Sequence, residues 1–340
     1  MNIFNLFASG LWNRKKIIGL VLIFATILGG LLIGFTLIQT NNPKTYDITD
    51  FPDFFTKTED YFITRIGSVP LIDENSYELK VTGCIKNPRN FTLSELQALP
   101  LIHYPLTIEC IGNPSIGSLI STANWTGFSI YDLINMLGIE SNATGVKYTA
   151  ADGYYVTHTL NQLMNNSVIG ALYINNQTLP LIQGFPLRII NPGYYGAKQP
   201  AWVTELEVIN MPLSDYWDDR GWDTSPPMPI DSKIFYIEQY FEIQSGDSVI
   251  IGGAAYGGTR VSKVEVTINN GINWYEADII KNVDRDNVWV FWSFQLKIVG
   301  QGLKTIYAKA TDIFNQTQPK LDSIKYDGDN SWPFLNIIVN

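Results

Sequence analysis

The residue best suited to chemistry in this chain is Cys110, which stands where an apolar run breaks into a turn. The segment reads LTIECIGNP over residues 106–114. Its leucine and isoleucines favour a buried strand, and the Gly-Asn-Pro that follows is a turn former that ends it. A thiolate at a strand end would project from rigid backbone toward a cavity. Cys110 is therefore a candidate metal ligand, although a free cysteine in such a run also packs as a small hydrophobic side chain.

Two cations form a second candidate group, within residues 171–209. Glycines and prolines at 180, 184, 186, 192, 193, 196 and 200 demand turns there, and two strand-like runs between them present Arg188 and Lys198. Cations on short strands beside glycine-rich turns can hold an anion such as a phosphate. The alternative is that both are solvated surface charges.

The cysteine and histidine content restricts which metal site the chain can build. Cys84 and Cys110 are the only cysteines, and His103 and His158 are the only histidines. These numbers exclude a zinc ribbon, a cysteine-ligated iron–sulfur cluster and a multi-histidine centre, and no Cys-x-x-Cys-His haem attachment motif occurs. A redox metal must therefore come largely within an organic cofactor. A disulfide between the two cysteines is the competing possibility, because it would consume the thiol.

Composition indicates two strand-rich domains. A chain of 340 residues with 46% hydrophobic residues exceeds what one core usually holds. Only 16% of residues are charged, and 27 glycines and 17 prolines favour strands and turns over a helical bundle. The net charge is −9 and Lys/Arg runs occur only at the N-terminus, which argues against nucleic acid as a partner.

The N-terminal segment predicts a membrane anchor. Residues 17–38 carry no charge and are long enough to cross a bilayer as a transmembrane helix. Basic residues 14–16 precede this span and an acidic linker, residues 39–58, follows it, so residues 1–16 are expected in the cytoplasm. The rest of the chain would then lie on the extracytoplasmic side of the cell membrane. A cleaved signal peptide and a degenerate twin-arginine signal are the alternatives.

Hydrophobic patterns divide the remaining chain into two regions. Residues 59–225 mix a strand over 77–82, helices over 92–99 and 129–137 capped by Thr92 and Ser129, and a strand over 202–209. Prolines at 226, 227 and 229 mark the boundary, and residues 226–340 show only strands and turns, among them 263–268, 289–298 and 305–311. The predicted fold class is α+β, a mixed α/β domain followed by an all-β sandwich of immunoglobulin-like size.

Several of these segments, taken in order, resemble the sulfite oxidase family of molybdopterin-dependent oxidoreductases. They read FITRIGSVP from residue 62, TIECIGN from 107, GFPLRIINPGYYGAK from 184, and VEVTINNGINWYEA and AKATDIFNQTQP from 264 and 308. The resemblance covers most of residues 60–320. It implies a sulfite-oxidase-like cofactor domain and an immunoglobulin-like dimerisation domain, and therefore a possible homodimer.

The resemblance also implies roles for individual residues. Cys110 would be the protein ligand of the molybdenum, and Arg188 and Lys198, with Gly196 in the same segment, would hold the pterin phosphate. Gln183 stands where relatives place His or Asn against the cofactor, and Thr64, Arg65 and Asp152 fall in segments that wall the pterin. The expected catalytic residues are Cys110, Trp222 and Arg65; the expected cofactor ligands are Thr64, Arg65, Cys110, Asp152, Gln183, Arg188, Gly196 and Lys198.

The implied function is two-electron oxygen-atom transfer on a small-molecule substrate by a membrane-anchored enzyme. Having no haem, it would exchange electrons with an external carrier such as a cytochrome or a small copper protein. Thr64-Arg65-Ile66, Pro114 and Ser115, and Trp222 replace the Arg-Asn-His triplet, the arginines and the tyrosine of sulfite-oxidising members, so sulfite is not the expected substrate. The alternatives are a reductase of a sulfoxide or another oxo-substrate, and a non-catalytic surface protein that kept the fold without the metal.

Overall fold

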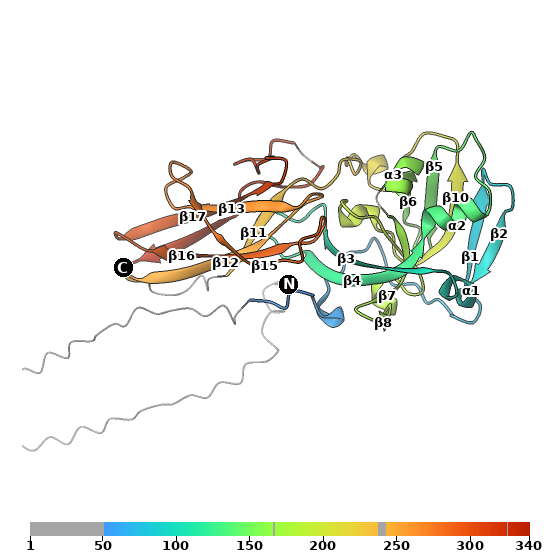
Figure 1. Cartoon of the computed structure of the whole chain (residues 1–340), viewed down its shortest axis with the longest axis horizontal. Coiled ribbons are helices and arrows are strands. Elements are labelled where there is room, and N and C mark those ends of the chain that lie inside the picture. Colours follow the sequence, from blue (N-terminus) through green and yellow to red (C-terminus); the bar gives the residue numbers. More distant parts are fainter. Residues whose placement is uncertain (1–50, 166, 237–242, 325) are drawn as a thin grey trace, which may run out of the picture. The chain divides into compact units, whose positions relative to one another are not determined.

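The computed structural model describes residues 51–340, except 166, 237–242 and 325 (Figure 1). The predicted cytoplasmic segment, the predicted membrane span over 17–38 and most of the predicted linker lie outside the described residues. Within the described part of the chain, no helix combines the length and the apolar character that crossing a bilayer requires.

One sheet of the N-terminal region is built around β1 (Glu78–Gly83), whose alternating exposed and buried residues bear out the predicted strand. β1 runs parallel to β10 (Val203–Ile209), and the other pairs of the sheet are antiparallel. The strand order is β2-β1-β10-β5-β6, with β2 at Arg89–Thr92, β5 at Gly145–Ala150 and β6 at Tyr155–Thr159.

Three short helices accompany these strands: α1 (Leu93–Gln97), α2 (Ile130–Met136) and α3 (Leu160–Asn165). The two predicted caps are confirmed. The hydroxyl of Thr92 accepts the amide of Glu95, whose carboxylate accepts the amide of Thr92 in return. The hydroxyl of Ser129 accepts the amide of Asp132 at the start of α2. Both caps satisfy amides that lack a partner within the helix.

A second sheet carries the segments that matter for the site. Its order is β3-β4-β7-β8, with β9 paired to β7; the strands are β3 (Leu101–Glu109), β4 (Ile120–Ser129), β7 (Ile169–Ile174), β8 (Gln177–Thr178) and β9 (Arg188–Ile190). β3 is an edge strand of this order, which is where a proline such as Pro105 is tolerated because it donates no ladder hydrogen bond. β3 ends one residue before Cys110 and β9 begins at Arg188, so one sheet positions both candidates.

The C-terminal region is a sandwich of two four-stranded sheets, as predicted. One has the order β11-β12-β16-β15, at Asp231–Tyr236, Ser248–Tyr256, Val290–Lys297 and Asp278–Lys281; the other has the order β14-β13-β17-β18, at Tyr275–Glu276, Val261–Thr267, Gly302–Asp312 and Phe334–Val339. Inward-facing side chains of both sheets, Trp292 and Val264 among them, form one buried cluster. The sandwich thus has its own hydrophobic core.

A separate buried cluster joins the end of β3 to the sandwich. It includes Ile111 and Tyr195 from the N-terminal region and Tyr256 and Trp289 from the sandwich. The amide of Trp289 donates to the hydroxyl of Thr107 at 2.8 Å, and its indole donates to the carbonyl of Phe54 at 2.9 Å. All described residues belong to one compact unit. The strand that leads to Cys110 therefore packs on both regions.

Candidate active site

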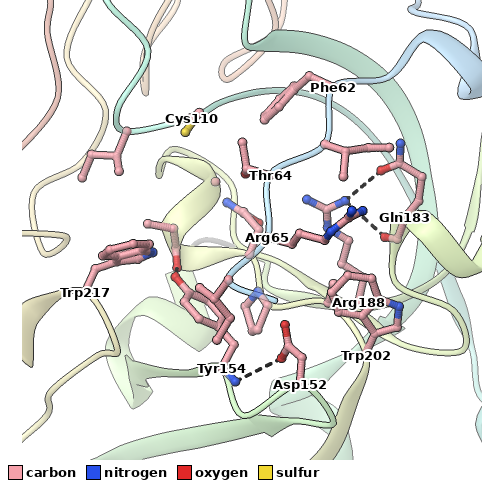
Figure 2. A pocket seen from close by; sticks show the side chains of 18 of the residues that line it. Phe62, Thr64, Arg65, Cys110, Asp152, Tyr154, Gln183, Arg188, Trp202 and Trp217 are labelled. Atoms are coloured by element: carbon pink, nitrogen blue, oxygen red, sulfur yellow. Dashed lines mark hydrogen bonds between the residues drawn. The ribbon is translucent and has the colours of Figure 1, made fainter. Parts of the chain in front are cut away.

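A cavity of about 270 Å³ gathers most of the predicted site residues, although they come from distant parts of the sequence (Figure 2). Eight of the predicted residues line it: Thr64, Arg65, Cys110, Asp152, Gln183, Arg188, Gly196 and Trp222. Lys198 is not among its lining residues. The remaining walls are largely apolar and aromatic, which is typical of a pocket that holds an organic ligand.

Cys110 stands directly after β3, as predicted, in a turn that its own backbone closes. Its amide donates to the carbonyl of Leu119 at 3.0 Å, and its carbonyl accepts the amide of Asn113 at 2.9 Å. Cys110 and Cys84 are both free thiols, so the alternative of a disulfide between them is not realised. The thiol of Cys110 is thus available to a ligand in the cavity.

The surroundings of the Cys110 thiol act in both directions on its acidity. Burial is the largest influence and raises the pKa of the thiol, whereas a hydrogen bond with the Gly112 amide lowers it. The neighbouring Glu109 carboxylate raises this pKa further, and a hydrogen bond with the Thr64 side chain lowers it. A thiol in this state stays protonated until a cation displaces the proton, and a coordinated thiol is deprotonated outright.

Gly196 belongs to the segment that carries Arg188 and Lys198, and it lies where the backbone of this segment approaches the end of β3 next to Cys110. A Cβ atom at this position would lie 3.3 Å from the carbonyl oxygen of Glu109 and 3.9 Å from the Cα of Cys110. Because the first of these distances is tighter than ordinary van der Waals contact, a larger residue would push the two segments apart. The glycine therefore allows the close approach that brings both candidate segments to one cavity.

Arg188 faces the cavity from the first residue of β9. Its Nη1 donates to the backbone and side-chain oxygens of Gln183, each at 3.2 Å (Figure 2). Gln183 ends the 3₁₀ turn η4 (Leu181–Gln183), is itself buried, and donates from Nε2 to the carbonyl of Tyr61 at 3.0 Å. The guanidinium carbon lies 5.3 Å from the ring centroid of Trp125. Gln183 and Trp125 therefore hold the guanidinium in place.

The guanidinium of Arg188 retains a hydrogen-bond donor with no partner among the described residues. Its Nε is buried and unpaired, and burial lowers the pKa of the group, whose ordinary value is far above neutrality. A buried, unpaired cationic donor is costly unless an anion completes it. The side chains of Arg188 and Cys110, which lie apart around the cavity (Figure 2), fit a cofactor with a thiolate-binding metal at one end and a phosphate at the other.

Lys198 is the predicted site residue that the structure does not bring to the cavity. It ends the 3₁₀ turn η5 (Gly196–Lys198) and is 5% exposed. Its ammonium lies 2.5 Å from a carboxylate oxygen of Asp215 and 3.2 Å from the carbonyl of Thr157. The alternative that it is a solvated surface charge is wrong, and its contact with a phosphate stays a prediction that this geometry does not favour.

Two tryptophans that contact each other, Trp217 and Trp222, line the cavity, and one of them approaches the Cys110 turn. Trp222 approaches Gly112, where an added Cβ would lie 3.7 Å from its ring, and Trp217 lies with its ring centroid 6.2 Å from that of Trp222. The turn containing η6 (Asp218–Arg220) places them together, because the amide of Trp222 donates to the carbonyl of Trp217 at 3.1 Å. The sequence prediction missed Trp217. The density of aromatic residues in YWDDRGW, residues 216–222, was the available signal.

Three further lining residues differ in how firmly they are held. The carboxylate of Asp152 accepts the amide of Tyr154 at 3.0 Å and so closes its own turn, while the hydroxyl of Tyr154 donates to the carbonyl of Ala197 at 2.7 Å. Tyr154 lines the cavity and also packs with Ala150 and Val156 in a buried cluster. Arg65 lines the cavity from an exposed position. Arg65 is therefore accessible to a ligand, whereas Asp152 shapes the cavity floor.

Two family models match the chain in succession. Residues 66–217 match the oxidoreductase molybdopterin binding domain, and residues 224–339 match the Mo-co oxidoreductase dimerisation domain. The first match includes Cys110, Gln183 and Arg188 of the cavity lining, and the second includes the complete sandwich. Residues 218–223, which lie between the two matches, directly precede the proline-rich stretch that was predicted as the boundary.

Relatives with curated functions align over most of this chain. Sulfite oxidase of Arabidopsis thaliana is 26% identical over 325 residues, covering 78% of this chain and 83% of that protein. NADH nitrate reductase of Volvox carteri is 26% identical over 79% of this chain but only 38% of its own length. Mitochondrial sulfite oxidase of Drosophila melanogaster is 25% identical over 84% of this chain and 58% of its own length. The chain thus spans less than two thirds of the latter two relatives.

A solved structure shares the fold. The sulfane dehydrogenase SoxCD from Paracoccus pantotrophus superimposes with a TM-score of 0.72 over 86% of this chain and 85% of that chain, at 17% sequence identity. At this identity the likeness concerns the fold alone. The shared fold is mostly β, with an N-terminal region of few helices followed by a β-sandwich.

Proposed function

Because this chain belongs to the sulfite oxidase family of molybdenum-dependent oxidoreductases, we propose that it carries out two-electron oxygen-atom transfer at a molybdenum ligated by Cys110. The observation that carries the proposal is the cavity itself, which brings together the thiol of Cys110 and the unpaired donor of Arg188. When bound, molybdenum–molybdopterin supplies the electron and oxygen chemistry, and the protein supplies position and electrostatics.

The chain's own residues divide this work. Cys110 holds the metal from the end of β3, and the Thr64 side chain, which hydrogen-bonds the thiol, stabilises its deprotonated form. Arg188, fixed by Gln183, would bind the phosphate with the part of its guanidinium that lines the cavity. Trp217 and Trp222 exclude water from the side of the cavity next to the Cys110 turn. Arg65 orients the substrate or the pterin from the exposed rim.

A second candidate within this chemistry is the reduction of a neutral oxo-substrate such as a sulfoxide. The specific observation is the composition of the lining, in which apolar and aromatic residues such as Ile111, Trp217 and Trp222 outnumber the cations. A small dianion such as sulfite needs positive donors next to the reacting centre. The arginines of the cavity are Arg65 and Arg188, and Arg188 is engaged by Gln183 on the side away from Cys110.

The placement of the enzyme and its partners are part of the proposal. The uncharged span over residues 17–38 supports a single-pass anchor in the cell membrane, with the catalytic region on the extracytoplasmic side. The match to a dimerisation domain supports a homodimer. The reducing equivalents would pass to or from a separate carrier, a cytochrome or a small copper protein, since the sequence has no haem attachment motif.

Metal and pterin content of protein purified with its N-terminal segment tests the proposal. We expect near-stoichiometric molybdenum and pterin in the wild type and loss of the metal with loss of all oxygen-transfer activity in Cys110→Ser, because an alcohol is a poor ligand for a soft metal. Cys84→Ser is the matched control and should keep both metal and activity, since Cys84 lies outside the cavity lining. Full metal content and activity in Cys110→Ser would refute the ligand assignment.

A further inference from the structure

A buried lysine of the C-terminal sandwich contacts the turn that carries Cys110. Lys233, in β11, is 1% exposed. Its ammonium lies 3.0 Å from an oxygen of Glu109, 3.0 Å from an oxygen of Asp231 and 3.1 Å from the carbonyl of Pro114. An ammonium has three hydrogens to donate, so these three acceptors use all of them.

Two of these three acceptors bracket Cys110. Glu109 is the residue directly before it and Pro114 is four residues after it, so a single ammonium ties together both ends of the turn. Inside that turn Asn113 donates from Nδ2 to the same oxygen of Glu109 at 2.8 Å and accepts the amide of Leu119 at 3.0 Å. The backbone on both sides of Cys110 is therefore fixed by contacts that converge on Glu109 and Lys233.

The charges in this cluster make the contact strong and costly to break. Burial by itself would lower the pKa of the Lys233 ammonium, but attraction to Glu109 and Asp231 outweighs burial and raises this pKa above its usual value. Lys233 therefore stays charged. Asp231 has further partners within the sandwich, because Tyr256 donates to it at 3.0 Å and Gln318 at 2.6 Å. Lys233 is thereby anchored on the sandwich while it reaches the Cys110 turn.

We propose that Lys233 is a positioning residue for the metal site, which uses the sandwich as a rigid support to fix the Cys110 thiol in the cavity. The sandwich then does more than mediate association between chains, because the geometry of the metal ligand depends on it. The proposal rests on the proposed function only in taking Cys110 as the metal ligand. A side chain that does not touch the metal can change metal affinity in this way when it fixes the orientation of a ligand.

The test compares Lys233→Met with Asp312→Ala in the full chain. Asp312 is another buried charged residue of the sandwich, 4% exposed, and its carboxylate accepts hydrogen bonds from the Thr259 hydroxyl and from the amides of Phe314 and Gln316, each at 2.8 Å. None of these contacts touches residues 109–114. Asp312→Ala therefore reports what a general loss of stability in the sandwich does to the rest of the protein.

The first measurement is amide hydrogen exchange, resolved by peptide, in protein from which the metal has been removed. In Lys233→Met we expect exchange over residues 110–119 to accelerate by about tenfold or more. The local opening that exposes these amides to solvent would no longer have to break the Lys233 contacts, so it would cost less free energy. Asp312→Ala should leave exchange over these residues as in the wild type. Unchanged exchange over residues 110–119 in Lys233→Met would overturn the proposal.

Lys233→Arg is the second variant, used if Lys233→Met gives no soluble protein. It keeps the charge but changes the direction of the hydrogen-bond donors, so we expect it to accelerate exchange at the same residues. An unchanged exchange rate in Lys233→Arg would count equally against the proposal.

The second measurement is the thiolate-to-metal charge-transfer absorption of the molybdenum-loaded enzyme. We expect this band to shift or weaken in Lys233→Met and to remain in place in Asp312→Ala. A band that is identical in all three proteins would also overturn the proposal, because the ligand geometry would then be independent of Lys233. A wild type that contains no molybdenum contradicts the proposed function instead, and hydrogen exchange then still decides the role of Lys233.

Discussion

Arg188 and Lys198 stand ten positions apart in one segment, and the sequence assigns both to the same task, yet the structure gives them different surroundings. Arg188 lines the cavity, pairs with the neutral side chain of Gln183 and keeps a buried donor free. Lys198 is not among the residues that line the cavity, and it pairs with the carboxylate of Asp215, which is completely buried. Arg188 is therefore available to bind an anionic ligand, whereas Lys198 is already paired with an anionic side chain.

The difference teaches that the partner of a buried cation, more than its type or its spacing, decides its role. A neutral partner such as Gln183 fixes a guanidinium without cancelling its charge, so the field of the cation still reaches the cavity. A carboxylate partner cancels the charge in place, and a buried pair of this kind serves the fold. Among the described residues, the buried Lys198 and Lys233 and the half-buried Arg188 follow this division, since Lys233 is likewise paired with carboxylates.

The largest effect is expected for Lys198→Met, and it is an effect on stability. Removing the ammonium leaves the buried carboxylate of Asp215 with only the hydrogen bonds from Thr157 and Thr224. Breaking one partner out of a buried ion pair costs about 3–5 kcal/mol in free energy of unfolding. Chemical denaturation of the metal-free protein measures this loss. A variant that unfolds like the wild type but loses the cofactor would break the comparison, because Lys198 would then act on the phosphate.

Arg188→Met is expected to act on the cofactor instead. The variant would lose the proposed charged hydrogen bond to the phosphate, and such bonds contribute about 1.5–3 kcal/mol, so the affinity for the pterin cofactor should fall by roughly tenfold to a hundredfold. Stability of the metal-free protein should change much less than in Lys198→Met, because the hydrogen-bond partner that Arg188 loses, Gln183, is neutral and no buried carboxylate is left without its cation. Pterin content after dialysis at increasing dilution measures the affinity.

Arg89→Met is the matched control for this prediction. Arg89 is exposed and pairs with Glu95 beside α1, and it is not among the residues that line the cavity. Its variant should keep the wild-type pterin content. Equal losses of pterin in the Arg188 and Arg89 variants would show that the retention assay reports total positive charge rather than a contact in the cavity.

Local patterns were sufficient to predict much of the fold and part of the site. The capping of α1 by Thr92 and of α2 by Ser129 depends on residues three positions apart, and the strand that ends before Cys110 depends on a run of apolar residues and a turn. Such signals lie within one element, where side-chain periodicity and backbone hydrogen bonding act directly. Cys110, Arg188 and Gln183 could be located for the same reason, once the family resemblance had given them roles.

The pairings that decide how charges act could not be predicted, because they join residues far apart in the sequence. Asp215, the partner of Lys198, follows it by a whole strand, β10, and Lys233 reaches Glu109 from another domain. No periodicity reports which carboxylate will meet which ammonium when sheets pack together. Trp217 was missed for a related reason, since its place beside Trp222 depends on how the turn over residues 217–222 closes.

The smallest predicted effect concerns His158, a buried residue that contacts the backbone of Lys198. Its imidazole is completely buried, and Nε2 lies 3.2 Å from the carbonyl of Lys198. Burial, followed by the charge of Lys198, lowers the pKa of His158 to about 3. The unfolded chain binds a proton here near pH 6.5, whereas the folded protein does so only near pH 3, so the stability that this group contributes is complete above pH 6.5 and is lost as the pH falls toward 3.

His158→Gln should therefore flatten the dependence of stability on pH in the acid range. Glutamine can still donate to the carbonyl of Lys198, but it has no proton to bind in the unfolded chain. In the wild type, the unfolded chain binds up to one proton more than the folded protein at this residue. The slope of the free energy of unfolding against pH should therefore fall in the variant by up to about 1.4 kcal/mol per pH unit between pH 6 and pH 4. Urea denaturation at several pH values measures it, with His103→Gln as control, since His103 is exposed and should leave the wild-type slope. An unchanged slope in His158→Gln would mean that His158 accepts a proton in the folded protein, and the region around Lys198 would then be less closed than its ion pair with Asp215 indicates.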